Sequence, residues 1–370
     1  MYRTDCRHFN GYKPCQFKRS CTNCPYFDQV RTRVVIVSLE AMGAVLRSTV
    51  LLKPIKEKYP GVHITWITLP MCSPLLQNNP DIDRIMVLSP KNHAAIQFLE
   101  FDVLFSVDKS IEAGALSASI RAEKKYGFGL DTFGNIVPFS PHAQYQYDVG
   151  LNDELKFKIN QMTENEQITR SMGLPFKRDE YILDLTREEK ILVGERRAAI
   201  LQGKSGIIGY NTGCSLLFPY KKFTVERGVQ VISEWRNRFP DYAVALLGGP
   251  EDTSRQESMK SFFLDDPMVV NTPTEDGLRS GILWMDTADV VLSGCSLGMH
   301  IAIGLKKKVV AWFGVSCIQE VDLYDRGVKI QSDVTCSPCW KKSCTNEPKC
   351  FDKVEPTLIG DAVQSLLESR

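Results

Sequence analysis

The residues best suited to chemistry form one short turn late in the chain. They are Ser296, Leu297, Gly298, Met299 and His300. The apolar run that ends at Leu292 predicts a buried strand before this turn, and residues 309–313 predict a strand after the helix that the turn opens. Backbone N–H groups in the first turn of a helix lack intrahelical partners, and the helix dipole favours an anion there. The turn therefore predicts a phosphate-binding site, with a ligand-free βα turn as the alternative and a packing role as the alternative for His300.

The cysteines form a second group with chemical potential, because most of the twelve lie in two clusters. The clusters are Cys6, Cys15, Cys21 and Cys24, and Cys336, Cys339, Cys344 and Cys350. Four thiolates suit zinc, iron or an iron–sulfur cluster. In a cytosolic chain such clusters indicate metal more than disulfides. The sequence predicts a structural metal at each cluster, with disulfides, free thiols or one shared site as the alternatives.

Composition excludes several classes of protein. The chain has 370 residues, which favours about two or three domains, and 43% of them are hydrophobic, which is ample for buried cores. Its 45 Lys and Arg balance 44 Asp and Glu, so the charge gives no case for nucleic acid. No apolar run is long enough to span a membrane, and the polar N-terminus is unlike a signal peptide. We expect a cytoplasmic protein, for which contact with the inner membrane surface stays open.

Alternating strands and helices must position these groups. In the first half, strands are predicted at 33–39, 62–67, 82–88 and 101–107, with helices up to Lys58, over 70–79 and up to Lys125. Residues 126–185 are less regular, with a helix near 154–172, and a charged helix follows at 187–197. In the second half, strands are predicted at 205–210, 242–247, 268–270, 290–292 and 309–313, with helices at 225–239, 278–285, 357–367 and from Gly298. This alternation predicts an α/β fold of two Rossmann-like, doubly wound domains.

The predicted domains follow from where the pattern restarts. They are a Cys-rich segment at 1–32, a first Rossmann-like domain at 33–187, a second at 188–335, and a Cys-rich finger with a C-terminal helix at 336–370. Two doubly wound domains of this kind are expected to face a cleft.

Several short motifs occur in one order along the chain. They are Met42-Gly43-Ala44 with Thr49, Lys56-Glu57-Lys58-Tyr59-Pro60, Thr212-Gly213, Lys221-Lys222-Phe223-Thr224, Leu247-Gly248-Gly249-Pro250-Glu251 and Ser296-Leu297-Gly298-Met299-His300-Ile301-Ala302. In this order and spacing they resemble glycosyltransferase family 9, the ADP-heptose:lipopolysaccharide heptosyltransferases, over nearly all of residues 33–365. The C-terminal cysteines resemble, in kind and not in spacing, the iron-binding finger of the related autotransporter heptosyltransferases.

The resemblance implies a GT-B fold whose second domain binds the sugar nucleotide, in the segment that includes Thr212 and Gly213. It implies that backbone groups of residues 296–299 hold the diphosphate, that Lys221 neutralises phosphate, and that Glu251 contacts the ribose. Catalysis in this family is inverting and needs no metal. Without the resemblance, Lys221 is a surface lysine and Glu251 a helix-start residue.

The chain departs from the family at the catalytic base. The family has an Asp where this chain has Ala44, and alanine cannot take a proton from an acceptor hydroxyl. Glu40 in the same turn, or Asp108 at the end of a neighbouring strand, could replace it; a structural ion pair with Lys109 is the alternative for Asp108. An inactivated enzyme or a binding protein would equally account for Ala44. Cys295 stands where relatives have an Asp before the turn.

The sequence thus predicts a cytoplasmic glycosyltransferase that transfers a heptose-like sugar from ADP-heptose to a glycan or glycolipid such as lipopolysaccharide core. A protein acceptor is less favoured, and a homo-oligomer stays open. The rival hypotheses are a catalytically inactive sugar-nucleotide-binding or assembly protein and, more weakly, a metal-cluster redox sensor.

Overall fold

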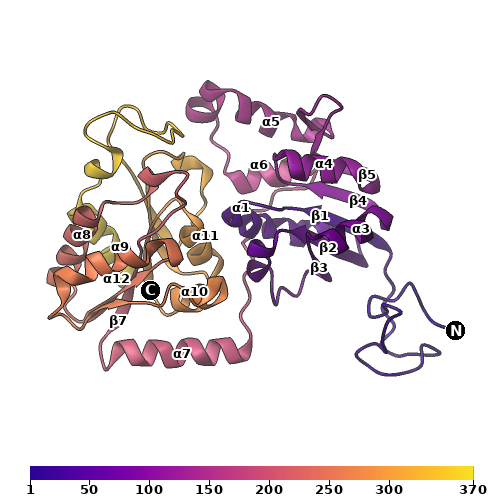
Figure 1. The fold of residues 1–370 in the computed structure, drawn as a ribbon, viewed down its shortest axis with the longest axis horizontal. Coiled ribbons are helices and arrows are strands. Elements are labelled where there is room, and N and C mark those ends of the chain that lie inside the picture. The colour runs from indigo at the N-terminus through magenta and orange to yellow at the C-terminus, as the bar shows by residue number, and fades with distance from the viewer. Residues whose placement is uncertain (370) are drawn as a thin grey trace. The chain divides into compact units, whose positions relative to one another are not determined.

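The computed structural model describes residues 1–369, and these separate into two compact units. Unit 1 comprises Met1–Lys156 and Glu164–Glu180, and unit 2 comprises Phe157–Thr163 and the chain from Tyr181 onward. Each unit contains one six-stranded sheet in the described part of the chain (Figure 1). The four-part division predicted from the sequence is finer than this one and stays a prediction.

Unit 1 is built on a mostly parallel sheet in the order β3-β2-β1-β4-β5-β6, in which only the β5–β6 pair is antiparallel among the described strands. Its strands are β1 (Thr32–Val37), β2 (Val62–Thr68), β3 (Arg84–Val87), β4 (Glu100–Ser106), β5 (Arg121–Leu130) and β6 (Ile136–Pro138). Its helices are α1 (Met42–Arg47), α2 (Leu52–Lys58), α3 (Pro90–Phe98), α4 (Ile111–Ser119), α5 (Gln144–Leu151) and α6 (Glu164–Ser171).

The helix predicted up to Lys125 is wrong in its second half. The helix α4 ends at Ser119, and residues 121–130 form the strand β5, which pairs with β4 in parallel. The first residues of β5 are largely exposed or half-buried and include Glu123 and Lys124, so they lack the apolar run of a buried strand. Pairing with β4 decides their conformation, because strand preference depends strongly on context.

Unit 2 is built on a parallel sheet in the order β12-β11-β10-β7-β8-β9. Its strands are β7 (Gly206–Asn211), β8 (Tyr242–Leu247), β9 (Val269–Asn271), β10 (Val290–Gly294), β11 (Lys308–Phe313) and β12 (Gly327–Gln331). Its helices are α7 (Arg187–Leu201), α8 (Val225–Arg238), α9 (Thr253–Lys260), α10 (Gly277–Asp286), α11 (Leu297–Gly304) and α12 (Pro356–Glu368). The two Rossmann-like sheets predicted from the sequence are therefore present.

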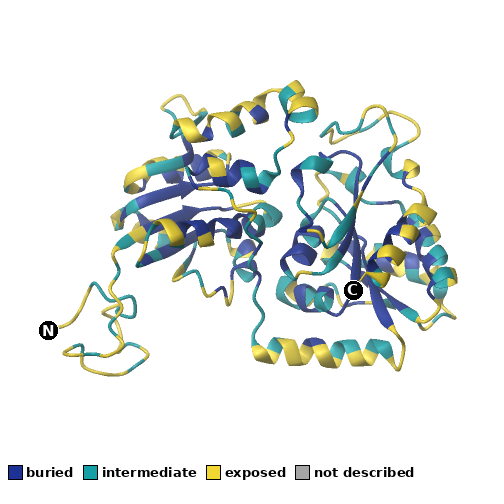
Figure 2. Ribbon diagram, turned by 180° about the vertical axis from the view of Figure 1, so that it is seen from behind, coloured by how far each residue is buried: buried dark blue, intermediate teal, exposed yellow. Residues whose placement is uncertain are grey.

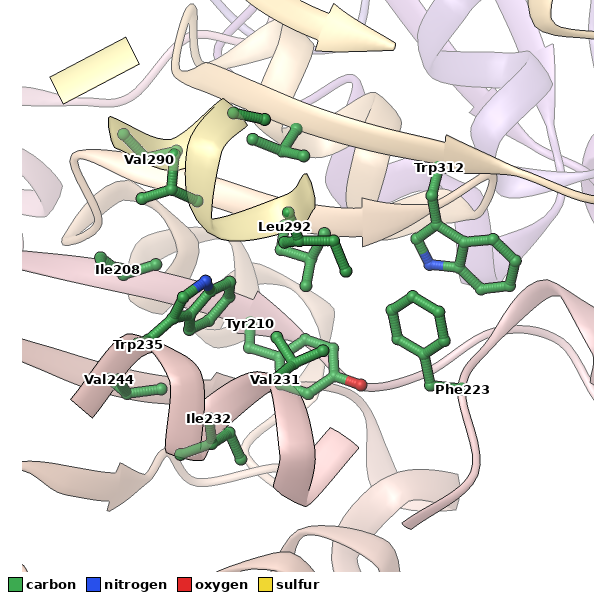
Figure 3. Close-up of a cluster of buried hydrophobic side chains, with 14 of the residues drawn as sticks. Ile208, Tyr210, Phe223, Val231, Ile232, Trp235, Val244, Val290, Leu292 and Trp312 are labelled. Carbon is green, nitrogen blue, oxygen red and sulfur yellow. The ribbon is translucent and has the colours of Figure 1, made fainter. Parts of the chain in front are cut away.

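The central strands of both sheets are apolar because helices cover both of their faces. The last four residues of β1 and all of β7 are buried, as the dark strands in Figure 2 show. One core cluster lies between the second sheet and the helices α8 and α12. In this cluster Phe223 stacks on Trp312 with ring centroids 4.4 Å apart, and Tyr210 meets Trp235 edge to face (Figure 3).

Each sheet has a point where the strand order reverses, and open α/β sheets bind ligands beside the carboxyl ends of strands at such points. In unit 1 the reversal lies between β1 and β4, and in unit 2 it lies between β7 and β10. Functional side chains are therefore expected directly after these four strands.

Among the described residues, no helix has the length and apolar character that crossing a membrane requires.

Candidate functional site

The reversal point of unit 1 brings Glu40 and Asp108 together. Asp108, after β4, is only 7% exposed, and its carboxylate accepts the backbone N–H of Leu39, the backbone N–H of Glu40 at 3.1 Å and the hydroxyl of Ser38 at 3.4 Å. Burial raises the pKa of Asp108, whereas the three hydrogen bonds lower it. The effect of burial is the larger one, and the resulting pKa is about 6. Asp108 therefore fastens the turn after β1, and the exposed carboxylate at this end of the sheet is that of Glu40.

The position of the family's base lies beside this turn. Ala44 is in the first turn of α1 and is half-buried, and its carbonyl accepts the Ser48 hydroxyl at 2.7 Å. Its methyl group offers no proton acceptor. Lys109, the proposed ion-pair partner of Asp108, donates to the Gln146 carbonyl at 2.7 Å. Glu40, which is exposed, stays the candidate for a base in this unit.

The reversal point of unit 2 is organised by the side-chain amide of Asn211, the last residue of β7. Its nitrogen donates to the hydroxyls of Ser293 at 2.9 Å and Ser296 at 3.0 Å, and to the carbonyl of Gly213 at 3.1 Å. These contacts tie the end of β7 to the turn between β10 and α11. Asn211 is buried, so the turn has a fixed geometry.

The first turn of α11 keeps its backbone donors. Ser296 is the N-cap residue but makes no side-chain cap hydrogen bond, because its hydroxyl faces Asn211 and Ser293 instead. Gly298 lies against Asn211, and a Cβ there would come within 2.4 Å of the Asn211 Cγ. The glycine therefore lets the helix start close to β7. Uncapped N–H groups at a helix start favour an anion, as the sequence predicts for residues 296–298.

Side chains of the other predicted residues in this turn point to structural roles. Met299 is fully buried, and His300 is 7% exposed. The Nδ1 atom of His300 lies 3.1 Å from the Tyr181 hydroxyl, and the two rings are stacked at 5.9 Å. The packing role that the sequence offered as the alternative for His300 thus has a specific partner.

Lys221 lies at the same edge of the sheet. Its carbonyl packs on Gly294, at the end of β10, where a Cβ would come within 1.9 Å of the oxygen. Its ammonium lies 4.0 Å from the ring centroid of Trp340 and 4.9 Å from that of Phe218. Within residues 1–369 this ammonium has no carboxylate partner. A half-buried ammonium without a carboxylate partner has the charge that attracts a phosphate.

The segment around Thr212 and Gly213 is fixed by contacts with Leu247 and Asp252. The Thr212 hydroxyl donates to the Leu247 carbonyl at 3.1 Å, so it is engaged within the sheet. Gly213 lies against Asp252, where a Cβ would come within 1.9 Å of a carboxylate oxygen. Glu251, the predicted ribose contact, is exposed, whereas the neighbouring Asp252 is buried and accepts the Gly249 N–H at 3.1 Å. Burial raises the pKa of Asp252.

The C-terminal cysteines belong to a loop of residues 332–353, which we call the cysteine loop. Burial raises the pKa of the Cys350 thiol to about 11, and the neighbouring Cys339 and Cys344 add to the effect. Cys350 packs on Gly314, where a Cβ would lie 2.6 Å from the sulfur. Cys336 is exposed.

The N-terminal cysteines line a cavity of about 820 Å³ within residues 1–27, together with His8. Arg7 fastens this segment to the first sheet, because it donates to the Val62 carbonyl at 2.8 Å and pairs with Asp83. The N-terminal segment is thus attached to unit 1 through Arg7.

Thiolates at both clusters have the donor chemistry of a zinc or iron site. Among residues 1–369, however, the structure assembles no group of three or more His, Cys, Asp or Glu side chains that could hold a metal ion. Metal at either end therefore stays a prediction.

Four functional candidates were missed in the sequence: Asn211, Ser293, Asp252 and Arg255. Arg255 donates to the carbonyls of Thr212, at 3.0 Å, and Phe223, and so connects the two segments that flank Lys221. Asn211 had a readable signal, since it is a polar residue that ends an apolar run. The roles of the others depend on contacts between segments distant in sequence.

No protein-family model matches the chain. An alignment over 136 residues, which covers 32% of this chain, is 29% identical to the lipopolysaccharide core heptosyltransferase OpsX of Haemophilus influenzae, and it spans only 39% of that protein. The crystal structure of a family 9 glycosyltransferase from Veillonella parvula superposes with a TM-score of 0.68 at 16% identity and covers 91% of this chain and 98% of that one. The fold is that of the family 9 glycosyltransferases.

Two further structures support this fold assignment. The E. coli ADP-heptose lipopolysaccharide heptosyltransferase II superposes with a TM-score of 0.64 at 16% identity, over 90% of this chain and 98% of that one. The iron-containing dodecameric glycosyltransferase TibC of enterotoxigenic E. coli superposes with a TM-score of 0.54 at 10% identity, over 91% of this chain and 76% of the TibC chain. At these identities the likeness confirms the heptosyltransferase-like GT-B fold inferred from the motifs.

Proposed function

We propose that the chain is a glycosyltransferase that moves a sugar from a nucleoside diphosphate sugar to an acceptor hydroxyl. The observation that carries the proposal is the turn at the reversal point of unit 2. There Asn211 fixes Ser296, the first turn of α11 keeps its N–H donors, and Lys221 offers an unneutralised ammonium. Fixed donors of this kind bind a diphosphate and stabilise the charge that develops on it as it leaves.

The proposed reaction is a single displacement with inversion. The acceptor oxygen forms a bond to the anomeric carbon while the bond from that carbon to the phosphate oxygen breaks. The acceptor proton passes to a carboxylate, and the nucleoside diphosphate leaves with the electron pair. We assign the proton acceptor to Glu40, because it is exposed at the ligand-binding end of the first sheet, whereas Asp108 is buried and accepts three hydrogen bonds.

The donor and acceptor follow from the relatives and are the finer part of the proposal. OpsX is a lipopolysaccharide core heptosyltransferase, and the superposed E. coli enzyme is named for ADP-heptose. We therefore propose ADP-heptose as the donor and a lipopolysaccharide-type glycan or glycolipid as the acceptor. Two further properties stay predictions. One is a cytoplasmic location, at the inner membrane surface or away from it, and the other is self-association.

Ala44 supports a second candidate function. A chain that lost its base would still bind the donor through unit 2, and it would then serve as a sugar-nucleotide-binding or assembly protein. The two functions differ in turnover and not in donor affinity. Structural metal at the cysteine clusters is compatible with both, and no metal is assigned to the reaction.

The deciding experiment measures binding and release of nucleotide with a panel of sugar nucleotides that includes ADP-heptose. We expect micromolar to millimolar binding of one donor, and release of its nucleoside diphosphate in the presence of a lipopolysaccharide-core acceptor. Binding without release, with acceptor present, would favour the inactive protein. Absence of binding to every donor in the panel would refute both functions.

A further inference from the structure

A tryptophan of the cysteine loop holds the lysine that we assign to the donor phosphate. Trp340 directly follows Cys339, and the Lys221 ammonium lies 4.0 Å from its ring centroid. Phe218 meets Trp340 edge to face at 5.2 Å and lies 4.9 Å from the same ammonium. The Lys221 ammonium thus lies against two aromatic rings. The face of such a ring attracts an ammonium through its quadrupole.

The backbones of both partners are fastened to neighbouring strand ends. The Lys221 carbonyl packs on Gly294 at the end of β10. The backbone N–H groups of Cys339 and Trp340 donate to the Val315 carbonyl, at 3.1 and 2.9 Å, two residues after β11 ends. Since β10 and β11 pair in register, with Gly294 opposite Trp312, the lysine and the tryptophan are held at the same edge of the sheet.

Further contacts join the cysteine loop to the segment that carries Lys221. Tyr220 stacks on Phe351 at 6.4 Å, and its hydroxyl donates to the Cys344 carbonyl at 3.4 Å. The Ser337 hydroxyl donates to the Gly314 carbonyl at 2.6 Å. The loop therefore packs against the segment that carries Lys221 and against the residues after β11 through several contacts, and not through the Lys221–Trp340 pair alone.

We propose that Trp340 is a positioning residue of the donor site, which makes the cysteine loop a part of that site. The inference rests on the proposed function, because it gives Lys221 a phosphate to bind. A lysine side chain loses much conformational freedom when it is immobilised on a ligand. Trp340 restricts the ammonium to one position before the donor arrives, so less of that freedom is lost on binding.

The test follows the contact and the affinity separately. Lysine amines are converted to ¹³C-dimethylamines, which keep their charge, and the Lys221 signal is assigned by its loss in Lys221→Arg. Binding of ADP, UDP and GDP is measured by calorimetry on the full chain. The variants are Trp340→Phe and Trp340→Leu, and the matched control is Trp284→Leu, which removes a different cation–aromatic contact of unit 2, that with Arg196 at 4.4 Å.

We expect the Lys221 methyl signal of the unaltered chain to be displaced by the ring current of Trp340. The displacement should shrink in Trp340→Phe and vanish in Trp340→Leu, and the Kd of the bound nucleoside diphosphate should rise in step, about three- to tenfold in Trp340→Leu. Trp284→Leu should change neither. Cooperative thermal unfolding of each variant establishes that it is folded.

Three outcomes would overturn the proposal. An undisplaced Lys221 signal in the unaltered chain would show that the contact is absent. A displaced signal that vanishes in Trp340→Leu with an unchanged Kd would show a structural contact only. Tighter binding in Trp340→Leu would show that the tryptophan competes with the phosphate. If the unaltered chain binds none of the three diphosphates, the proposed function is refuted. That outcome depends on the unaltered chain alone and is therefore distinct from the three above.

Discussion

The buried carboxylate of Asp108 accepts the backbone N–H of Glu40 at 3.1 Å, so one acid of unit 1 positions the main chain of the other. The two residues follow the neighbouring strands β1 and β4, but their environments differ. Asp108 is only 7% exposed, whereas Glu40 belongs to the exposed residues. Different environments separate the roles of paired acids. Here the buried acid orders the turn, and the exposed acid is the one that we propose as the base.

Glu40→Gln is expected to lower kcat for sugar transfer by about 10²-fold or more, because the amide cannot take the acceptor proton. Donor affinity should change little, since the donor site is assigned to unit 2. Glu123→Gln is the matched control, an exposed glutamate of the same unit on β5. Equal kcat values in Glu40→Gln and the unaltered chain would exclude Glu40 as the base.

Asp108 is expected to make stability depend on pH in an unusual direction. Its pKa is raised from 3.8 to about 6, so between these values the native state binds more proton than the unfolded state. The contribution of Asp108 therefore increases the free energy of unfolding as the pH falls through 6 toward 4. The same contribution disappears as the pH rises through 6. Such a displacement of the pKa corresponds to about 3 kcal/mol at most.

The measurement compares the unaltered chain with Asp108→Asn by urea unfolding at several pH values. The difference in the free energy of unfolding, unaltered minus variant, should increase as the pH falls from 7 to 4. Carboxylates whose pKa is lowered by arginine, such as Glu189 beside Arg279, act in the opposite direction but cancel in this difference. A difference that is flat or decreases would refute the raised pKa of Asp108.

Much of this arrangement could be predicted from the sequence, because local patterns decide it. The β-branched runs of β1 and β10 are buried on both faces and are readable as parallel strands. The start of α11 was readable from the small residues around Gly298. The strand β5 was not, because its register with β4 gives a charged segment the strand conformation.

The contacts that support the candidate sites were beyond sequence reasoning for a physical reason. The roles of Asn211 and Ser293 arise when two strands 82 residues apart lie side by side. The role of Trp340 likewise depends on a loop that folds back over residues 218–221. Glu251 stays a prediction from its motif, whereas the burial of its neighbour Asp252 is a property of the fold that the motif does not show.

Gly298→Ala is expected to damage the donor site. The new Cβ would lie 2.4 Å from the Asn211 Cγ, and Asn211 cannot yield without losing its three hydrogen bonds. We expect a loss of about 1–3 kcal/mol in the free energy of unfolding and at least about tenfold weaker binding of the nucleoside diphosphate.

The control is Gly281→Ala in α10, where, apart from chain neighbours and the nearby backbone of the helix itself, no described atom lies within 4 Å of the added Cβ. That change should stabilise the chain by about 0.5–1 kcal/mol, because alanine favours a helix. Urea unfolding and calorimetry on both variants check the opposite signs. Unchanged donor affinity in Gly298→Ala would remove the turn from the site.

The two cysteine clusters are each expected to hold one zinc or iron ion after anaerobic purification. Elemental analysis should find close to two metal equivalents per chain, with one lost in Cys24→Ser and the other in Cys350→Ser. Cys72→Ser is the control, since this free thiol is buried in the core of unit 1 and belongs to neither cluster. One equivalent that both cluster variants abolish would indicate a shared site, and none would refute the prediction. A visible iron–sulfur absorption band would revive the redox-sensor hypothesis.

Ala44→Asp decides between an enzyme with a relocated base and a chain that has lost its base. The substitution should be tolerated, because position 44 is half-buried in the first turn of α1, where an acid interacts favourably with the helix dipole. If Glu40 is the base, the unaltered chain releases nucleoside diphosphate in the presence of acceptor, and Ala44→Asp changes that rate by less than about tenfold. Ala44→Asn, of the same size but without a base, is the control. Turnover by Ala44→Asp alone, with neither the unaltered chain nor Ala44→Asn active, would mean that the chain binds its donor without transferring the sugar.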